Sequence, residues 1–574
     1  MTRRMLVPVV FILSLPLAVA AQPRPISPAD YGKWESLGGA TLAPGGDWLA
    51  YAVSRVTEEN ELRIRGIERD TTILVAYGES PAFSGGGDWL AYAIGVSSDE
   101  RERLTEEEKP VKERAAIVNL STLETVEVDD IASFRFSGDG RFLALHAYPP
   151  EDKHAAVLIV RDLERGTTTT FGDVSDFAWS DAGALLALTL ETENGAGNAV
   201  QLYDARSGTI RVLDSSTALY RALAWREDAP DLAVLRTRAD SAFRDTTHVL
   251  LAWRDADGET PSRIELDPAA TNGIPADMRI AEHFAPSWSD DGETLFFGLR
   301  PRERAERKDS TAVVAADSAN GEAPGDSARD TAATKEKRSD VQVWHARDVR
   351  IMPMQKAQEE QDLERTLLAA WHPAEDRVIR IGNDLFESTT VLGDGRWAVE
   401  TDRKPYAFGT MFGRESRDIW LIDVRTGDRR KALEDVRWYY GPSPTGEHLL
   451  WFDGEDYRSY DVASGTRTNL TERVDADFAN RDYDYPVDRL PAWGFAGWTK
   501  DDRALLAYDV YDVWSIAPDG SGASRLTNGA AEGVVHRYRS IRDDDDGIDA
   551  TKPLYFALAG KTTKKAGFAR LNPG

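Results

Sequence analysis

The chain has 574 residues, of which 41% are hydrophobic and 29% charged, a balance typical of a folded protein rather than a disordered one. Its 69 Lys and Arg stand against 97 Asp and Glu, and the net charge of −28 argues against nucleic acid and against an anionic membrane surface as partners. The absence of Cys excludes disulfides, thiolate metal sites and cysteine nucleophiles.

The first residues have the pattern of an export signal. Arg3 and Arg4 precede an apolar run that ends in the small residues Ala-Val-Ala at 18–20. This pattern predicts a signal peptide over residues 1–21, with an uncleaved anchor as the alternative. The mature chain, 22–574, is therefore expected to be exported to the periplasm or the extracellular space, with no membrane span after cleavage.

One repeat dominates the mature sequence: a small or aromatic residue, a turn rich in Ser, Asp and Gly, and a short apolar strand. Asp-Gly and Gly-Gly allow the positive φ of a tight hairpin turn, and strands such as WLAYAV are apolar on both faces, as strands between neighbouring sheets are. Nine stretches share this pattern, at residues 41–53, 82–94, 135–147, 178–190, 222–235, 287–297, 391–401, 441–452 and 496–509.

A second repeat closes many of these units with a turn that follows an apolar strand. It reads DLERG, DARSG, DVRTG and DVASG, at 162–166, 204–208, 423–427 and 461–465. The two repeats together predict four-stranded antiparallel sheets with a period of 40–55 residues, which is the signature of an all-β β-propeller. We predict seven to nine blades and favour eight, with one turn left over for an accessory strand; an array of β-sandwiches is the alternative fold.

Two segments interrupt the repeats. Residues 98–114 are a short charged excursion, and residues 301–340 contain no aromatic residue, no Leu and no Ile. A stretch of that composition buries too little surface to order itself, so 301–340 is predicted to be a disordered insertion. After it, 341–344 and 366–371 are predicted to be strands of one blade with a short helix between them; a single helix from 355 to 371 is the alternative.

Three segments carry a resemblance to a known family. They read PADYGKWESL at 28–37, DVQVWHARDVRIMPMQKAQEEQDLERTLLAAWH at 340–372 and GFAGWTKDDRALLAYDVYDVWSIAPDGSGASRLTN at 494–528. The chain resembles the N-terminal propeller of secreted bacterial prolyl oligopeptidase-family serine peptidases, a group related to dipeptidyl peptidase IV and the acylaminoacyl peptidases.

In that family the propeller carries no catalytic residue and caps a C-terminal α/β-hydrolase domain. The resemblance implies a substrate-gating and docking propeller that handles short peptides, with a hydrolase domain or chain as its partner and with no cofactor. The sequence stops about where that domain is expected to begin. The alternatives are a free-standing periplasmic TolB-like propeller that binds a peptide, glycan or protein, and a sialidase- or lyase-like propeller enzyme.

The catalytic serine of such a hydrolase domain lies in G-x-S-x-G, on a turn between a strand and a helix. Two partial matches occur, GESPA around Ser80 and GDSAR around Ser327, and both lack the closing Gly. We therefore expect no catalytic residue in this chain and no hydrolysis by the chain alone.

Other candidate groups favour structural roles. None of the eight histidines forms HxxxH or HExxH, and His146 and His448 fall in strand-like segments, so no metal site is expected. Two groups of Asp could hold Ca²⁺ but are better explained as solvated acidic loops: Asp482, Asp484 and Asp488, and the run Asp543 to Asp546. Glu359-Glu360 is interpreted as a pair on a helix surface.

Overall fold

The computed structural model describes residues 27–181, 183–271, 273–305, 350–410, 412–541 and 546–573. It divides into two compact units. Unit 1 runs to Phe136 and also includes Leu143–Tyr148 and Ile159–Thr168; unit 2 contains Ser137–Phe142, Pro149–Leu158 and the chain from Thr169 onward. The predicted signal peptide lies outside the described residues.

Unit 1 contains two complete four-stranded antiparallel sheets, β1-β2-β3-β4 and β5-β6-β7-β8, and after them β9, β10 and β11 neighbour one another in that order. The unit has two short helices, η1 and α1, before and within this series. The bounds are η1 Pro28–Lys33, β1 Glu35–Leu42, β2 Trp48–Arg55, β3 Glu61–Gly66, β4 Thr72–Ala76, β5 Gly78–Phe83, β6 Trp89–Ile94, α1 Ser98–Glu106, β7 Arg114–Asn119, β8 Thr125–Val128, β9 Ile131–Phe136, β10 Phe142–Ala147 and β11 Ala156–Asp162.

In the first part of unit 2 the strands again neighbour one another in chain order, as β12-β13-β14-β15 and β16-β17-β18-β19. A five-stranded sheet follows, in the order β20-β22-β23-β24 with β21 also paired to β22. The bounds are β12 Thr168–Trp179, β13 Leu185–Leu190, β14 Ala199–Asp204, β15 Thr209–Ser215, β16 Tyr220–Trp225, β17 Leu232–Arg238, β18 Thr247–Arg254, β19 Ser262–Leu266, β20 Met278–Ile280, β21 Ser287–Trp288, β22 Leu295–Pro301, α2 Met352–Ala357, α3 Glu359–Glu364, β23 Leu367–His372, η2 Pro373–Glu375 and β24 Arg377–Arg380.

The rest of unit 2 holds three further four-stranded sheets, β25-β26-β27-β28, β29-β30-β31-β32 and β33-β34-β35-β36, and the three-stranded sheet β37-β38-β39. The bounds are β25 Thr389–Val391, β26 Trp397–Asp402, η3 Lys404–Tyr406, α4 Ala407–Thr410, β27 Arg417–Asp423, β28 Arg429–Val436, β29 Trp438–Pro442, β30 His448–Phe452, β31 Tyr457–Asp461, β32 Arg467–Asn469, β33 Phe495–Trp498, η4 Lys500–Asp502, β34 Leu505–Tyr508, β35 Val513–Ile516, β36 Ala523–Arg525, α5 Gly529–Glu532, β37 Val534–Tyr538, β38 Leu554–Gly560 and β39 Ala566–Leu571.

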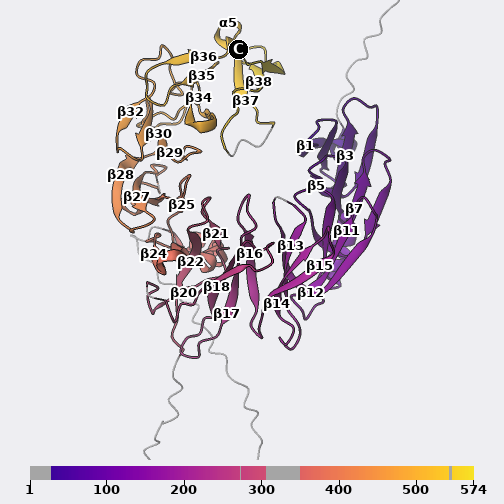
Figure 1. Cartoon of the computed structure of the whole chain (residues 1–574). Coiled ribbons are helices and arrows are strands. Elements are labelled where there is room, and N and C mark those ends of the chain that lie inside the picture. The colour runs from indigo at the N-terminus through magenta and orange to yellow at the C-terminus, as the bar shows by residue number, and fades with distance from the viewer. Residues whose placement is uncertain are drawn as a thin grey trace, which may run out of the picture. The chain divides into compact units, whose positions relative to one another are not determined.

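Each sheet is formed by strands that follow one another in the chain, so the colour changes gradually from sheet to sheet in Figure 1. Repeated four-stranded antiparallel sheets of this order are the blades of a β-propeller, and the predicted fold class is confirmed. The inner strands of the blades, second and third in each sheet, hold most of the buried residues: in β6 five of the six residues are buried, and in β23 all six are.

The nine turns found in the sequence all join the first strand of a blade to its second strand. Their serines explain the repeat. Ser137 accepts a hydrogen bond from the Phe142 amide (3.0 Å), and Ser289 accepts one from the Thr294 amide (3.0 Å). In both turns the serine hydroxyl donates to an aspartate two residues later, Asp139 or Asp291, at 2.6 Å. The repeated Ser and Asp therefore fold the hairpin.

The second repeat joins the third strand to the fourth, and its aspartate holds the turn. Asp204 accepts hydrogen bonds from the amides of Arg206 (2.9 Å) and Ser207 (3.4 Å), and Asp423 accepts from Arg425 and Thr426, both at 2.9 Å. Both repeats lie at the same end of each sheet, because the first-to-second and third-to-fourth turns of an antiparallel sheet share one end. We call it the repeat end.

The number of repeats is larger than the favoured eight. Each of the nine turns opens its own hairpin, so none is left over for an accessory strand. The three-stranded sheet β37–β39 is a further unit. It lacks the repeated turn because its first two strands are joined by a long acidic segment, 539–553.

The segments around the predicted insertion fold in part as expected. Residues 306–349, which include most of 301–340 and the predicted strand 341–344, lie outside the described residues. The first residues of the insertion are ordered, since Arg304 bridges to Phe243 and the Arg302 guanidinium lies 3.6 Å from the centre of the Phe243 ring. Residues Leu367–His372 form a strand paired with β22, so that prediction is confirmed and the single helix over 355–371 is wrong.

Candidate functional site

The other end of each sheet carries the connections that do not repeat. There the second strand leads to the third, and the fourth strand leads to the next blade. We call it the variable end. Helix α1 lies in such a connection, between β6 and β7, and so do α2 and α3, between β22 and β23. Functional residues tend to lie on connections held by a rigid scaffold, so the variable end is where a site is expected.

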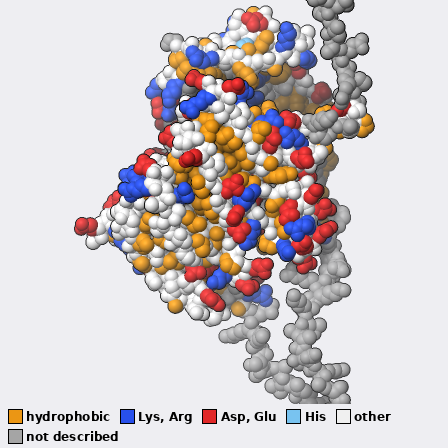
Figure 2. Space-filling view, turned by 90° about the vertical axis from the view of Figure 1, so that its right-hand side faces the viewer, with side chains coloured by type: hydrophobic (Ala, Val, Ile, Leu, Met, Phe, Trp, Pro, Cys, Tyr) orange, Lys and Arg blue, Asp and Glu red, His pale blue; other side chains and the backbone are white. Residues whose placement is uncertain are grey.

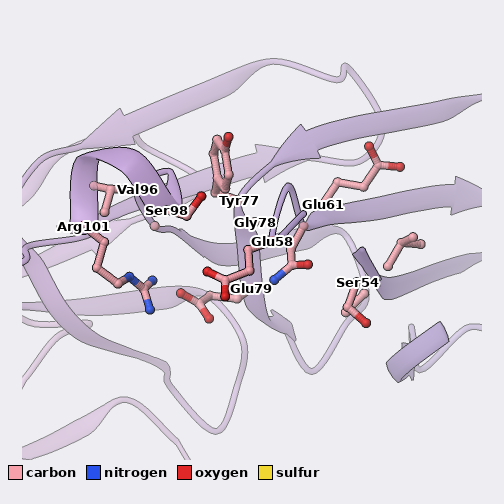
Figure 3. A pocket seen from close by; sticks show the side chains of 13 residues that line it. Ser54, Glu58, Glu61, Tyr77, Gly78, Glu79, Val96, Ser98 and Arg101 are labelled. Carbon is pink, nitrogen blue, oxygen red and sulfur yellow. The ribbon is translucent and has the colours of Figure 1, made fainter. Parts of the chain in front are cut away.

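Unit 1 has a pocket of ≈ 490 Å³ at its variable end. It is formed by three connections: β2 to β3, β4 to β5, and β6 to α1 (Figure 3). We call it the unit 1 pocket, and its lining is Ala52, Val53, Ser54, Glu58, Asn60, Glu61, Tyr77, Gly78, Glu79, Gly95, Val96, Ser98 and Arg101. A more open hollow of ≈ 590 Å³ adjoins it and shares Glu58, Ser98 and Arg101.

Backbone hydrogen bonds fix the three connections to one another. The Asn60 side chain accepts from the Arg55 amide (3.0 Å), the Tyr77 amide donates to the Asn60 carbonyl (2.8 Å), and the Gly95 amide donates to the Tyr77 carbonyl (2.9 Å). Tyr77 adopts a left-handed backbone, with φ 57°. The pocket wall therefore consists of connections bound to each other rather than of independent loops.

The carboxylates of the pocket differ in whether they form ion pairs with basic side chains. Glu61 is paired with Arg55 (3.0 Å) and with Arg63 (2.5 Å), both of which also contact Glu35. In the part of the chain that the structure describes, no basic side chain is paired with Glu58 or Glu79, and in Figure 3 their carboxylates and the Arg101 guanidinium point into the pocket. The pocket thus offers two carboxylates and one guanidinium to a ligand.

A second carboxyl lies behind Glu79. The pKa of Glu113 is raised, first by burial and then by the charge of Glu79 and a hydrogen bond with it, while Arg101 acts in the opposite direction. Two carboxyl groups in hydrogen-bond contact hold one proton more readily than two separate groups do.

The Glu79–Glu113 contact gives a testable dependence on pH. Because the folded pKa of Glu113 is raised, its contribution to stability is complete below the ordinary value of 4.5 and is lost as the pH rises through the raised value. Glu113→Gln replaces the carboxyl by an amide that stays neutral at every pH. It should therefore raise Tm near pH 8 and make Tm depend less on pH. Thermal unfolding across the pH range measures this, with Glu124→Gln on the exposed β7–β8 turn as control. A variant less stable than the parent at high pH would contradict the account.

The candidate serines do not form an elbow. Ser80 lies in β5 with φ 52°, at the irregularity where β5 pairs with β6, and the chain continues into another strand rather than a helix. Ser327 lies outside the described residues. Ser80 therefore has the left-handed backbone of a strained turn without the strand–turn–helix context that a catalytic serine of this kind needs.

Several histidines are held in the sheets by their ring nitrogens. Nδ1 of His248 contacts the Ile280 carbonyl at 2.9 Å, and burial lowers the pKa of that imidazole. His372 contacts Thr294 Oγ1 and the Val424 carbonyl, both at 3.1 Å. His448 stacks on Trp498, with ring centres 5.6 Å apart. His345 lies outside the described residues.

The acidic loop with Asp482, Asp484 and Asp488 forms ion pairs with basic side chains of the same chain. Asp482 pairs with Lys561 at 2.5 Å, and Asp488 pairs with Arg437 at 2.7 Å, so two of its three carboxylates face different basic side chains. Asp543, Asp544 and Asp545 lie outside the described residues. Within the part of the chain that the structure describes, no group of three or more His, Asp or Glu is placed to hold a metal ion.

Glu359 and Glu360 begin α3 and are exposed, as a helix-surface pair should be. None of the sequence candidates lines the unit 1 pocket except Glu79, which the sequence singled out only as a neighbour of Ser80. The pocket residues are spread over three connections without a common spacing, so no motif signals them.

No protein-family model matches the chain, and no curated protein matches it significantly. Solved structures are similar to it at low identity. The β-propeller domain of the Trilobed protease from Pyrococcus furiosus has 12% identity and a TM-score of 0.28, over 71% of this chain and 97% of that one. A eukaryotic initiation factor has 14% identity and a TM-score of 0.38, over 74% of this chain and 86% of that one.

Pyrococcus horikoshii acylaminoacyl peptidase has 11% identity and a TM-score of 0.27, over 75% of this chain, and the chain spans 57% of that protein. These similarities assign no function by themselves. No helix among the described residues is long and apolar enough to cross a membrane.

Proposed function

We propose that the chain is a non-catalytic peptide-docking propeller, the substrate-gating portion of an exported serine peptidase whose hydrolase part is a separate domain or chain. The observation that carries the proposal is the unit 1 pocket, where no basic side chain among the described residues is paired with Glu58 or Glu79. A short peptide has a cationic amino terminus. The carboxylate of Glu58 and that of Glu79, which also contacts Glu113, favour such a group in the pocket.

The surroundings of the pocket support recognition of a whole peptide end rather than of a bare cation. Tyr77 and Val96 provide apolar surface beside the carboxylates, and Arg101 stands at the same wall with a positive charge. The Asn60 side chain and the backbone of the three connections supply hydrogen-bonding groups. A cation alone uses none of these features, whereas a peptide has an amine, amides and side chains for all of them.

The proposal is tested by binding of an Ala-Pro-Ala tripeptide with a free amino terminus, compared with its N-acetylated form. We expect the free form to bind more tightly, and Glu58→Gln or Glu79→Gln to weaken that binding by about tenfold, the size of one charge-assisted contact. Glu59→Gln is the matched control, because Glu59 is the exposed neighbour of Glu58 and lies outside the pocket lining. Equal binding of the two peptide forms, or an equal effect of Glu59→Gln, would overturn the proposal.

A further inference from the structure

A second pocket, of ≈ 360 Å³, lies in unit 2 and has the opposite character. It is formed around the connection from β28 to β29 and the connection from β30 to β31, again at the variable end of a blade. We call it the arginine pocket, and its lining is Glu434, Asp435, Val436, Arg437, Trp451, Phe452, Asp453, Arg458, Arg467 and Arg489.

Four guanidinium groups in one pocket are unusual in a chain with a net charge of −28. Phe452 is 1% and Trp451 8% exposed, and both belong to the buried second strand of the blade, β30. Arg437 lies over the Trp438 ring, 5.0 Å from its centre. An arginine stacked on an aromatic ring is held in place at little cost in side-chain entropy, so Arg437 is pre-positioned.

Three of the four arginines already have a carboxylate partner, and Arg458 pairs with Asp453 in the pocket wall. Arg467 donates to the Ala432 carbonyl (2.7 Å), and among the described residues no carboxylate is paired with it. Arg489 contacts Asp435 at 3.3 Å, with 43% and 48% of the two side chains exposed. Arg437 contacts Asp488 at 2.7 Å, and that aspartate is 63% exposed. The Arg437 side chain is itself only 13% exposed, so the Arg489–Asp435 pair is the one exposed on both sides. An exposed ion pair contributes little to stability, so a ligand can replace the carboxylate of Asp435 at little cost.

We infer that the arginine pocket binds a carboxylate group of a ligand, either the carboxyl terminus or an acidic side chain of a peptide. A carboxylate can accept hydrogen bonds from two parallel N–H groups of one guanidinium. In this pocket the ligand's carboxylate takes the place of a protein carboxylate on an arginine. Inorganic phosphate fits less well, because Glu434, Asp435 and Asp453 remain in the wall and repel a dianion. This inference goes beyond the proposed function and concerns a different pocket, so either can fail while the other stands.

The test is calorimetric titration of the full chain with N-acetyl-tetraalanine as the free acid and as the amide. Acetylation removes the amine, so the unit 1 pocket has no cationic group to bind. We expect the acid to bind at least about tenfold more tightly than the amide, and Arg467→Gln to remove that difference. Arg503→Gln, a fully comparable loss of charge at a 73% exposed arginine outside the pocket, should leave the difference intact.

A third peptide, N-acetyl-Ala-Glu-Ala-Ala-amide, distinguishes the two sources of the carboxylate. Tight binding of this peptide assigns the pocket to an acidic side chain, and tight binding of the tetraalanine acid alone assigns it to a carboxyl terminus; both support the inference. If Arg467→Gln does not fold, Arg489→Gln replaces it. Equal binding of acid and amide, no binding of either, an equal effect of Arg503→Gln, or tighter binding of inorganic phosphate than of the acid would overturn the inference.

Discussion

Asp512→Ala should lower the free energy of unfolding by about 3 kcal/mol or more. Asp512 is fully buried, and its carboxylate accepts hydrogen bonds from the Thr527 hydroxyl (2.7 Å), the Gly529 amide and the Ala530 amide (3.2 Å). Alanine removes the acceptor and leaves buried donors without a partner. This destabilises the fold more than removing the donor and the acceptor of a hydrogen bond together. Denaturant unfolding monitored by tryptophan fluorescence measures the change.

Asp475→Ala is the control for this prediction, since Asp475 is an exposed aspartate of the same unit and its loss should stay within about 0.5 kcal/mol. Asp512→Asn should fall between the two, because an amide oxygen still accepts one of the hydrogen bonds. A loss from Asp512→Ala no larger than that from Asp475→Ala would show that the carboxylate does not hold the connection together.

Gly393→Ala should be almost as damaging, for a steric reason. Gly393 has φ 34°, and a Cβ there would lie 1.8 Å from the carbonyl oxygen of Thr445, in the turn of the next blade. The two repeat-end turns contact each other through their backbones, so no side chain can rotate away. We expect a loss of about 3 kcal/mol, or failure to fold, measured by thermal and denaturant unfolding.

Gly208→Ala separates the steric effect from backbone strain. Gly208 has φ 76° in a third-to-fourth-strand turn, and a Cβ there would meet nothing within 4 Å. Its substitution should lower the free energy of unfolding by only about 1 kcal/mol, because alanine is strained in the left-handed conformation. Equal losses for Gly393→Ala and Gly208→Ala would contradict the close approach of neighbouring turns.

The sequence predicted the repeat end well and the variable end poorly, and the reason is physical. Turns such as those around Ser137 and Asp204 are closed by hydrogen bonds that side-chain oxygens accept from amides two to five residues away. Such local interactions need the same residues at the same spacing in every blade, and they leave a readable repeat. Exposed hydrophobic residues such as Leu74, which is 63% exposed on the edge strand β4, follow no repeat in the sequence. Figure 2 shows hydrophobic side chains at the surface between acidic and basic ones.

A further repeat was present in the sequence and was missed. Asp456 and Asp512 each immediately precede a third strand. Each accepts a hydrogen bond from a threonine hydroxyl fifteen residues later, Thr471 at 2.8 Å and Thr527 at 2.7 Å. The same threonines accept hydrogen bonds from the amides of Tyr457 (3.0 Å) and Val513 (3.1 Å). The signal was a D-x-x-D pair followed by Leu-Thr, and comparison of 453–471 with 509–527 would have revealed it.

The two pockets could not be predicted because their residues come from connections that differ in every blade. Glu58 and Glu79 belong to two different sheets and line one pocket. The other pocket combines Arg437 between β28 and β29, Arg467 in β32 and Arg489 between β32 and β33. Their spacing in sequence follows the lengths of those connections and has no chemical period. Only the fold brings these groups together, so a correct blade assignment was necessary but not sufficient.

The central claim, that this chain docks peptides without hydrolysing them, is tested most directly by a serine-reactive fluorophosphonate. Acyl transfer needs an activated nucleophile, a base and oxyanion donors held together, and Ser80 lies in a strand pair without that arrangement. Intact-mass measurement of the full chain after treatment should therefore find no stoichiometric label, under conditions where an active serine peptidase is labelled completely. One serine labelled stoichiometrically, with peptide turnover abolished by its substitution, would contradict the account.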